Sequence, residues 1–292
     1  MGNSFHVLVA TDASPQARAA LAATVAFPWP DGARAQGVIA AGVPGLTRWR
    51  RPTRAALVSW LRREAVRVRR TLRRRWADAE VVVVDPPAVK AIVERARRWR
   101  AQAIVLGSRG RGALHRALLG SVSRGVIHRA LCAVLVVKGE ARAPRRFLIG
   151  LDGSVRSRRA VGFVSGLQSP TDGRVTLLAV VEPTRSTSIG RLPAAVRAVV
   201  AAELAALDRQ RLVMARREVS TAARRLKRAG WTVEEIVRRG IPLRELLRTA
   251  STSRADIVVV GARGVGGFAR LLLGSVAEGT LAHAPVSVLI VK

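Results

Sequence analysis

The chain has 292 residues, of which 49% are hydrophobic, and its 51 basic residues outnumber 19 acidic ones to give a formal net charge of +32. This length suits two domains of ordinary size, and the single cysteine, Cys132, excludes an intrachain disulfide and a cysteine-rich zinc cluster. No signal peptide and no run of 18 apolar residues is present, so we expect a cytoplasmic protein without a membrane span.

Strand-like and helical patterns alternate through the first part of the chain. An apolar run over residues 5–10 ends at Thr11-Asp12, and Ser14 followed by Pro15 predicts the start of a helix that extends to Phe27. The further predicted elements are a weak strand Val38–Val43, a helix Thr53–Trp76, a strand Val81–Val84, a helix Ala88–Trp99, a strand Ala103–Leu106, a helix Val122–Leu131 and a strand Ala133–Val137.

The predicted helix Thr53–Trp76 has one apolar face and one strongly basic face. The apolar face is formed at helical spacing by Leu57, Leu61, Ala65, Val68 and Leu72. The other face carries Glu64 almost alone against Arg62, Arg63, Arg67, Arg69, Arg70, Arg73, Arg74 and Arg75. A run of charges on a helix is usually a solvated face, but like charges one turn apart repel each other, which strengthens the case for an anionic partner. Both interpretations stay open.

The positive charge is not confined to that helix. Residues 1–140 carry 25 basic and 8 acidic residues, a net +17, and residues 141–292 carry 26 and 11, a net +15. Such a field attracts nucleic acid or other polyanions at low salt. The composition leaves open whether this attraction is functional or non-specific.

The alternation restarts after a linker at Gly139–Arg146. Strands are predicted at Phe147–Leu151, Val175–Val181, Val233–Val237, Ile257–Val260 and Val286–Val291. Helices are predicted after Gly153-Ser154, at Pro193–Ala229 before a capping Gly230, and at Leu243–Ser251. The chain therefore reads as two tandem α/β domains, residues 1–140 and 145–292, each a doubly wound five-stranded parallel sheet with helices on both faces.

One glycine-rich motif occurs in both domains. It has the form G-x2-G-x9-G-S and comprises Gly107, Gly110, Gly120 and Ser121 in the first copy, and Gly261, Gly264, Gly274 and Ser275 in the second. Each copy follows a predicted strand and leads into a predicted helix. Glycines allow close backbone approach, and free N–H groups at a helix N-terminus favour anions, so the pattern predicts a phosphate-binding loop.

Two further residue types accompany each loop. The first strand of each domain ends in an aspartate, Asp12 or Asp152, and Arg109 or Arg263 lies within the glycine motif. Ligands of open parallel sheets bind beyond the carboxyl ends of the strands, where these segments are expected to meet. The arginine suits a phosphate, and the carboxylate suits a ribose, a base or a divalent cation.

Other nucleotide and catalytic motifs do not fit. None of the four lysines stands in a Gly-Lys-Ser/Thr loop, and the dinucleotide-like match at Gly264 has no counterpart in the first domain. No G-x-S-x-G elbow occurs, and the four histidines lack metal-like spacing.

With its two aspartate-ending strands and two glycine motifs, the sequence resembles the universal stress protein family in its tandem, ATP-binding form. The resemblance implies ATP bound with Mg²⁺ or Mn²⁺ in each domain. It also implies that the last strands, Ala133–Val137 and Val286–Val291, pair across the interface of the two domains, and that tandem chains form a homodimer. It implies ATP-binding roles for Ala10, Thr11, Asp12, Val43, Leu106, Gly107, Arg109, Gly110, Gly120, Ser121, Val122, Ser123, Gly150, Leu151, Asp152, Val180, Val260, Gly261, Arg263, Gly264, Gly274, Ser275 and Val276.

The sequence also departs from the family pattern. Gln102 replaces the aspartate found at Asp256, and Ala277 stands where Ser123 offers a hydroxyl, so the two sites are expected to differ. The expected function is a nucleotide-dependent stress-response regulator with little or no turnover. The alternatives are a nucleic-acid-binding protein that uses its arginine-rich surface, and a slow ATPase.

Overall fold

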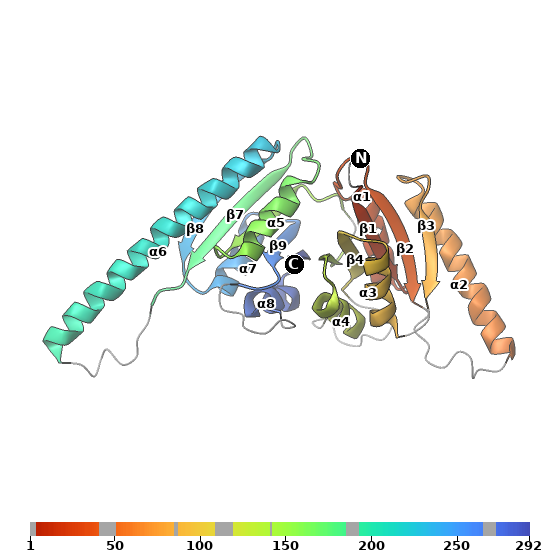
Figure 1. The fold of residues 1–292 in the computed structure, drawn as a ribbon, viewed down its shortest axis with the longest axis horizontal. Helices are drawn as coiled ribbons and strands as arrows, with labels where there is room; N and C mark the ends of the chain where they lie inside the picture. The colour runs from red at the N-terminus through yellow and green to blue at the C-terminus, as the bar shows by residue number, and fades with distance from the viewer. Residues whose placement is uncertain are drawn as a thin grey trace.

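A computed structural model describes residues 4–40, 51–84, 87–108, 119–140, 142–184, 193–264 and 273–292 (Figure 1). The elements of the first domain are β1 (His6–Thr11), α1 (Pro15–Ala26), β2 (Arg34–Ala40), α2 (Arg51–Leu72), β3 (Glu80–Val84), α3 (Ala88–Arg98), β4 (Ala103–Gly107), α4 (Ser121–Arg129) and β5 (Ala133–Val137). Those of the second are β6 (Arg146–Leu151), α5 (Val155–Ser165), β7 (Arg174–Val181), α6 (Ala194–Arg228), β8 (Thr232–Arg239), α7 (Pro242–Thr252), β9 (Ile257–Gly261), α8 (Ser275–His283) and β10 (Ser287–Val291).

The ten described strands form one sheet in the order β3-β2-β1-β4-β5-β10-β9-β6-β7-β8. Within each domain all neighbours are parallel, as predicted, whereas β5 and β10 pair antiparallel through Leu135 and Leu289. The last strands thus join the two domains of one chain. The expected pairing of the last strands across the interface of the two domains is confirmed. Because both edges of β5 and of β10 are occupied within the chain, these strands offer no edge to a second chain.

Local sequence explains where several elements begin and end. The Ser14 side chain accepts a hydrogen bond from the Ala17 N–H at 3.1 Å and caps α1. Strand β2 begins at Arg34, earlier than predicted, because its pairing with β1 starts there. Helix α2 ends at Leu72 and not at Trp76, because the next N–H groups bond one residue closer along the chain: Arg74 donates to the Thr71 carbonyl at 3.3 Å and Arg75 to the Leu72 carbonyl at 3.0 Å. The Trp76 indole that follows this turn is buried.

Two helical layers cover the sheet. Helices α1, α2, α5 and α6 pack on one face and α3, α4, α7 and α8 on the other, each face with one apolar core that runs through both domains. The predicted apolar face of α2 is confirmed, since Leu61, Val68 and Leu72 are buried. The placement of Glu64 on the charged face was wrong. Its side chain is 3% exposed and accepts a hydrogen bond from the Arg67 guanidinium at 2.6 Å, so it does not belong to the solvated face.

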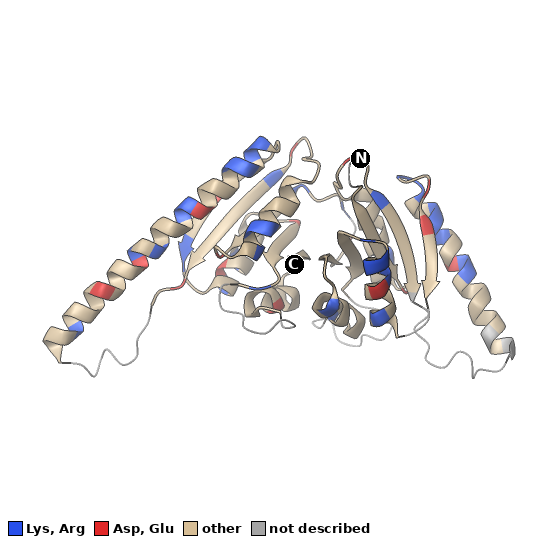
Figure 2. Ribbon diagram, viewed as in Figure 1, with Lys and Arg blue, Asp and Glu red and all other residues tan. Residues whose placement is uncertain are grey.

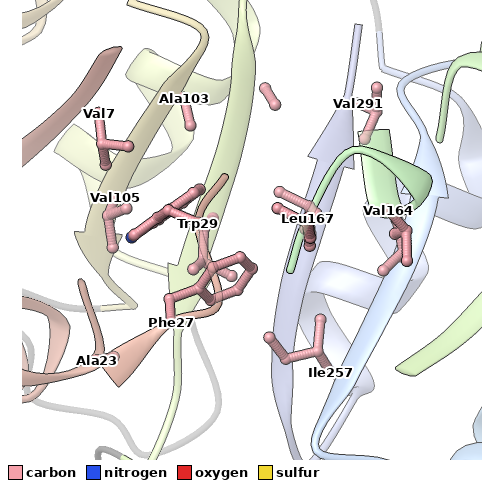
Figure 3. Close-up of a cluster of buried hydrophobic side chains, with 14 of the residues drawn as sticks. Val7, Ala23, Phe27, Trp29, Ala103, Val105, Val164, Leu167, Ile257 and Val291 are labelled. Atoms are coloured by element: carbon pink, nitrogen blue, oxygen red, sulfur yellow. The ribbon is translucent and has the colours of Figure 1, made fainter. Parts of the chain in front are cut away.

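Aromatic side chains continue the core across the domain boundary. Phe27 stacks on Trp29 with ring centroids 4.2 Å apart and meets Phe147 of the second domain edge-on at 6.1 Å. Figure 3 shows Phe27 and Trp29 facing Leu167 of the second domain. The two domains therefore share buried apolar surface as well as strand hydrogen bonds.

Two lysines tie each domain to a helix of the other. The Lys138 ammonium, after β5, donates to the Leu281 and Ala284 carbonyls at the end of α8, both at 2.7 Å. The Lys292 ammonium, after β10, donates to the Ile127 carbonyl of α4 at 2.5 Å. Because helix C-termini carry unpaired carbonyls and partial negative charge, these reciprocal contacts stabilise the interface. Among the described helices, none has the length and apolarity required to cross a bilayer.

Candidate functional site

A cavity of about 540 Å³ opens at the carboxyl ends of β6, β7 and β9, beside the point where strand order reverses. All eleven residues predicted for the second site line it: Gly150, Leu151, Asp152, Val180, Val260, Gly261, Arg263, Gly264, Gly274, Ser275 and Val276. Six lining residues were not predicted: Ser157, Leu178, Pro242, Leu246, Leu273 and Ala277. The structure thus brings the end of the first strand and the glycine motif together.

One wall of the cavity is apolar. Leu178 and Val180 come from β7, Leu246 from α7 and Val260 from β9, and Leu178 and Leu246 are almost fully buried. Helix α7 contributes because Pro242 at its first turn and Leu246 one turn later face the same strand ends. Such a wall suits a flat apolar group such as a nucleobase.

The opposite side of the cavity is polar. The Asp152 Oδ1 accepts the Ser154 N–H at 2.9 Å, which fixes the carboxylate over the turn into α5. The turn needs the left-handed conformation of Gly153, with φ +75°. Ser154 caps α5 by accepting the Ser157 N–H at 3.1 Å. The turn Gly153-Ser154 therefore fixes Asp152 at the cavity, and the Ser154 side chain accepts a hydrogen bond from the first turn of α5.

The first turn of α8 also faces the cavity. Its N-cap is Gly274, which has no side chain to cap the helix, so the N–H groups of Ser275, Val276 and Ala277 lie at an uncapped helix N-terminus. The Gly274 N–H is not available to a ligand, since it bonds the Ala262 carbonyl at 2.9 Å and closes the loop. The uncapped turn makes this rim of the cavity suited to an anion.

The glycines of the motif serve different needs. A Cβ at Gly261 would lie 2.9–3.1 Å from atoms of Arg156 and Ser157, so this glycine is required for packing β9 against α5. A Cβ at Gly264 would lie 2.6 Å from the Asp152 Oδ2. Gly264 therefore leaves space for the Asp152 carboxylate. This contact joins the glycine motif to the aspartate at the end of β6, and the residue spacing alone did not predict it.

Basic groups gather behind the glycine loop. Burial, and to a smaller extent the nearby positive charges of Arg263 and Arg156, lowers the pKa of Lys292 to about 8, while Cys132 opposes the shift. Burial also raises the pKa of the Cys132 thiol to about 11, so that it is neutral near pH 7. An anion at Arg263 would relieve the repulsion between these cations.

A comparison with protein-family models assigns both domains. The model of the universal stress protein family matches residues 4–138 and again 144–292. The chain belongs to the universal stress protein family. It is the tandem form, with two copies of the domain.

Individual relatives of this universal stress protein agree with that assignment. Universal stress protein Rv2005c of Mycobacterium tuberculosis is 34% identical over 209 residues, which cover 66% of this chain and 62% of the relative. The crystal structure of a universal stress protein from Archaeoglobus fulgidus superimposes with a TM-score of 0.69 at 20% identity, over 98% of this chain and 96% of the other. A functionally unknown protein from Pseudomonas aeruginosa shows the same fold at a TM-score of 0.56 and 16% identity, with 98% of this chain and 92% of the other covered.

The first domain of this universal stress protein places its predicted residues at equivalent positions. Ala10, Thr11 and Asp12 lie at the end of β1, Leu106 and Gly107 at the end of β4, and Gly120, Ser121, Val122 and Ser123 at the start of α4. As in the second domain, the Asp12 Oδ1 accepts the N–H two residues on, at 3.0 Å. Val43, Arg109 and Gly110 lie outside the described residues.

One detail of the first domain corrects an expectation drawn from its sequence, and two others concern its backbone. The Ser123 hydroxyl donates to the Gly107 carbonyl at 2.7 Å and the Gly120 N–H donates to the Ser108 carbonyl at 2.9 Å, so neither donor points to a phosphate. A Cβ at Gly107 would lie 2.8 Å from the backbone of Gln16, the same packing need as at Gly261. Ala13, at φ +63°, holds the left-handed position that glycine holds in the second domain.

Gln102 proves equivalent to the aspartate that it replaces. Its Oε1 accepts the His6 N–H at 2.5 Å, just as the Asp256 carboxylate accepts the N–H groups of Arg145 and Arg146 at 2.9 and 2.8 Å. Both side chains secure the start of the first strand of their domain, far from its carboxyl end. This departure from the family pattern therefore does not bear on the site.

Proposed function

We propose that this universal stress protein binds ATP in the second-domain cavity and acts as a nucleotide-dependent regulator. The observation that carries the proposal is the division of one 540 Å³ cavity into an apolar wall, a fixed carboxylate, and an uncapped helix N-terminus beside Arg263. This is the arrangement that an adenosine triphosphate needs from end to end.

Each part of the nucleotide has a counterpart in the cavity. The adenine packs between Leu178, Val180 and Leu246, and the ribose hydroxyls donate to Asp152. The phosphates extend towards Arg263 and the first turn of α8, where main-chain N–H groups and a guanidinium bind them. A Mg²⁺ ion is held mainly by the phosphates, because Asp152 is the one carboxylate among the described residues that line the cavity.

The proposal is one of binding without rapid turnover. Phosphoryl transfer requires a base or a residue that positions water near the γ-phosphate. In the described part of the cavity lining, Asp152 is the single candidate, and its Oδ1 is already bonded to the Ser154 N–H. A cytoplasmic location and a role in the stress response belong to the same proposal, supported by family membership and the single cysteine.

Calorimetric titration with ATP and Mg²⁺ tests the site. Arg263→Gln removes one charge-assisted phosphate contact and is expected to weaken binding roughly 10- to 100-fold. Arg248→Gln serves as the matched control, because Arg248 is exposed on α7 and does not line the cavity. Equal affinities of the wild-type protein and a folded Arg263→Gln variant for ATP would count against the assigned site.

A further inference from the structure

A second anion-binding feature lies on the outer helical layer, away from the nucleotide cavity. A surface hollow of about 440 Å³ is lined by Ser165 of α5, by Ala229, and by four residues of the last turns of α6: Thr221, Arg224, Arg225 and Arg228. Among the described residues, none of these three arginines forms an ion pair with a carboxylate. The hollow therefore presents three uncompensated guanidinium groups and two hydroxyls.

Two of the guanidinium groups are held in place. The Arg225 Nε donates to the Ser165 Oγ at 3.0 Å, and a Cβ at Gly162 would lie 3.1 Å from its Nη2, so this group rests directly on α5. The Arg224 Nη2 donates to the Thr221 Oγ1 at 3.0 Å. Arginines fixed by neutral hydroxyls keep their remaining N–H groups and their full charge for an external anion.

Part of the basic cluster is repeated in the first domain. At the 154-residue offset of the glycine motifs, Arg224 and Arg228 correspond to Arg70 at the end of α2 and Arg74 just after it, whereas Arg225 corresponds to Thr71. Lys227, which pairs with Glu235 and does not line the hollow, corresponds to Arg73. Figure 2 shows Lys and Arg gathered towards the C-terminal ends of both long helices, α2 and α6. These C-terminal ends both point to the same side of the molecule, at the top of the view. On α2 the stripe Arg63, Arg67 and Arg70, of which Arg67 is paired with Glu64, spans roughly 10 Å, the axial length of about three phosphates in one strand of a duplex.

We infer that these two clusters bind the phosphate backbone of double-stranded nucleic acid, independently of its base sequence. A duplex offers its phosphates without stacking on side chains, and Trp231, the aromatic residue nearest in sequence to the α6 cluster, is buried, as is Trp76 after α2, while Trp60 of α2 is half-buried. In the last turns of α6 the apolar residues Ala222, Ala223 and Leu226 are buried, and the exposed Val213 and Met214 lie more than two turns before Arg224. On α2, Val66 is 62% exposed between Arg63 and Arg67, so it is the α6 cluster that disfavours a membrane surface. The arginines and hydroxyls of that cluster match contacts to a duplex backbone.

The experiment is a fluorescence-anisotropy titration of a 20-base-pair DNA duplex at several NaCl concentrations, without ATP. The variant Arg224→Gln, Arg225→Gln, Arg228→Gln removes three phosphate contacts, so the slope of log K against log salt should become shallower by about 2 to 3. The control Arg97→Gln, Arg98→Gln, Arg129→Gln removes the same charge from exposed residues of α3 and α4 on the opposite face, and its slope should stay close to the wild-type value.

Ser165→Ala separates geometry from charge. It removes the hydroxyl that accepts the Arg225 Nε–H at unchanged net charge, so duplex affinity should fall while the fold is retained. The inference is overturned if both triple variants lose slope equally, if Ser165→Ala binds as the wild type does, or if wild-type binding disappears at 150 mM salt. It is also overturned if phosphatidylserine vesicles, and not the duplex, show the loss. Arg263→Gln should leave duplex binding intact, so failure of the ATP proposal would be seen separately.

Discussion

The pKa of Lys292 predicts that ATP binding takes up a proton. In the free protein burial, with smaller contributions from Arg263 and Arg156, lowers the pKa of this lysine to about 8. Phosphates placed at Arg263 neutralise these cations and raise the pKa in the complex, while the effect of burial remains. Below pH 8 the lysine is charged in both states. Above pH 8 only the complex keeps the proton, so affinity must fall as pH rises through 8.

The size of this effect follows from the two pKa values. The upper limit is reached if the complex remains protonated throughout: the ratio of dissociation constants at pH 9 and pH 7 is then about (1 + 10)/(1 + 0.1), or tenfold, and about half a proton is taken up at pH 8. Calorimetry at pH 7, 8 and 9, in pairs of buffers with different ionisation enthalpies, measures both quantities. Lys292→Arg keeps the charge but does not titrate in this range, so its affinity should be independent of pH. A wild-type affinity that is equal at pH 7 and pH 9, without proton uptake at pH 8, would refute the placement of phosphates beside these cations.

Three predictions concern the free energy of unfolding, measured by urea denaturation. Gly153→Ala should lower the free energy of unfolding by about 1 kcal/mol through backbone strain alone, because no atom lies within 4 Å of the added Cβ. The matched change Ala13→Gly should alter it by less than about 0.5 kcal/mol, since the relief of strain is offset by the loss of a buried methyl group. Gly261→Ala should cost about 1–3 kcal/mol because the Cβ meets the backbone of α5, whereas Gly166→Ala, with ordinary contacts of 3.5–3.6 Å, should be nearly neutral, and similar losses for both would contradict this packing argument. Lys138→Met should cost about 2 kcal/mol by leaving the Leu281 and Ala284 carbonyls without their donor, and unchanged stability would show that the contact contributes nothing.

The features predictable from sequence were those set by local pattern. Alternating apolar runs and helix signals such as Ser14-Pro15 gave the order of strands and helices, and the repeated motif placed one loop in each domain. Because parallel strands end at the same edge of a sheet, the approach of Asp152 to Gly264 followed from topology. All eleven residues predicted for the second site line its cavity for this reason.

The features that escaped prediction depend on tertiary contacts. Leu246 and Pro242 line the cavity only because α7 packs across the ends of β6 and β7, a contact that periodicity within α7 does not specify. Glu64 reads as surface charge in the helical pattern, yet it is buried beside Arg67. Gly261 fits a ligand-binding motif, but the atoms that exclude a side chain there belong to α5.

The antiparallel seam between β5 and β10 has a consequence for the evolution and engineering of the chain. It relates two similar domains by an approximate twofold axis, and each domain supplies a lysine that the other requires. A single domain released from the chain would carry an open strand edge and an unanchored helix, and a second copy of itself could satisfy both. The covalent connection thus replaces what two separate subunits would do by self-association, and it leaves each half free to change its pocket without the other having to follow.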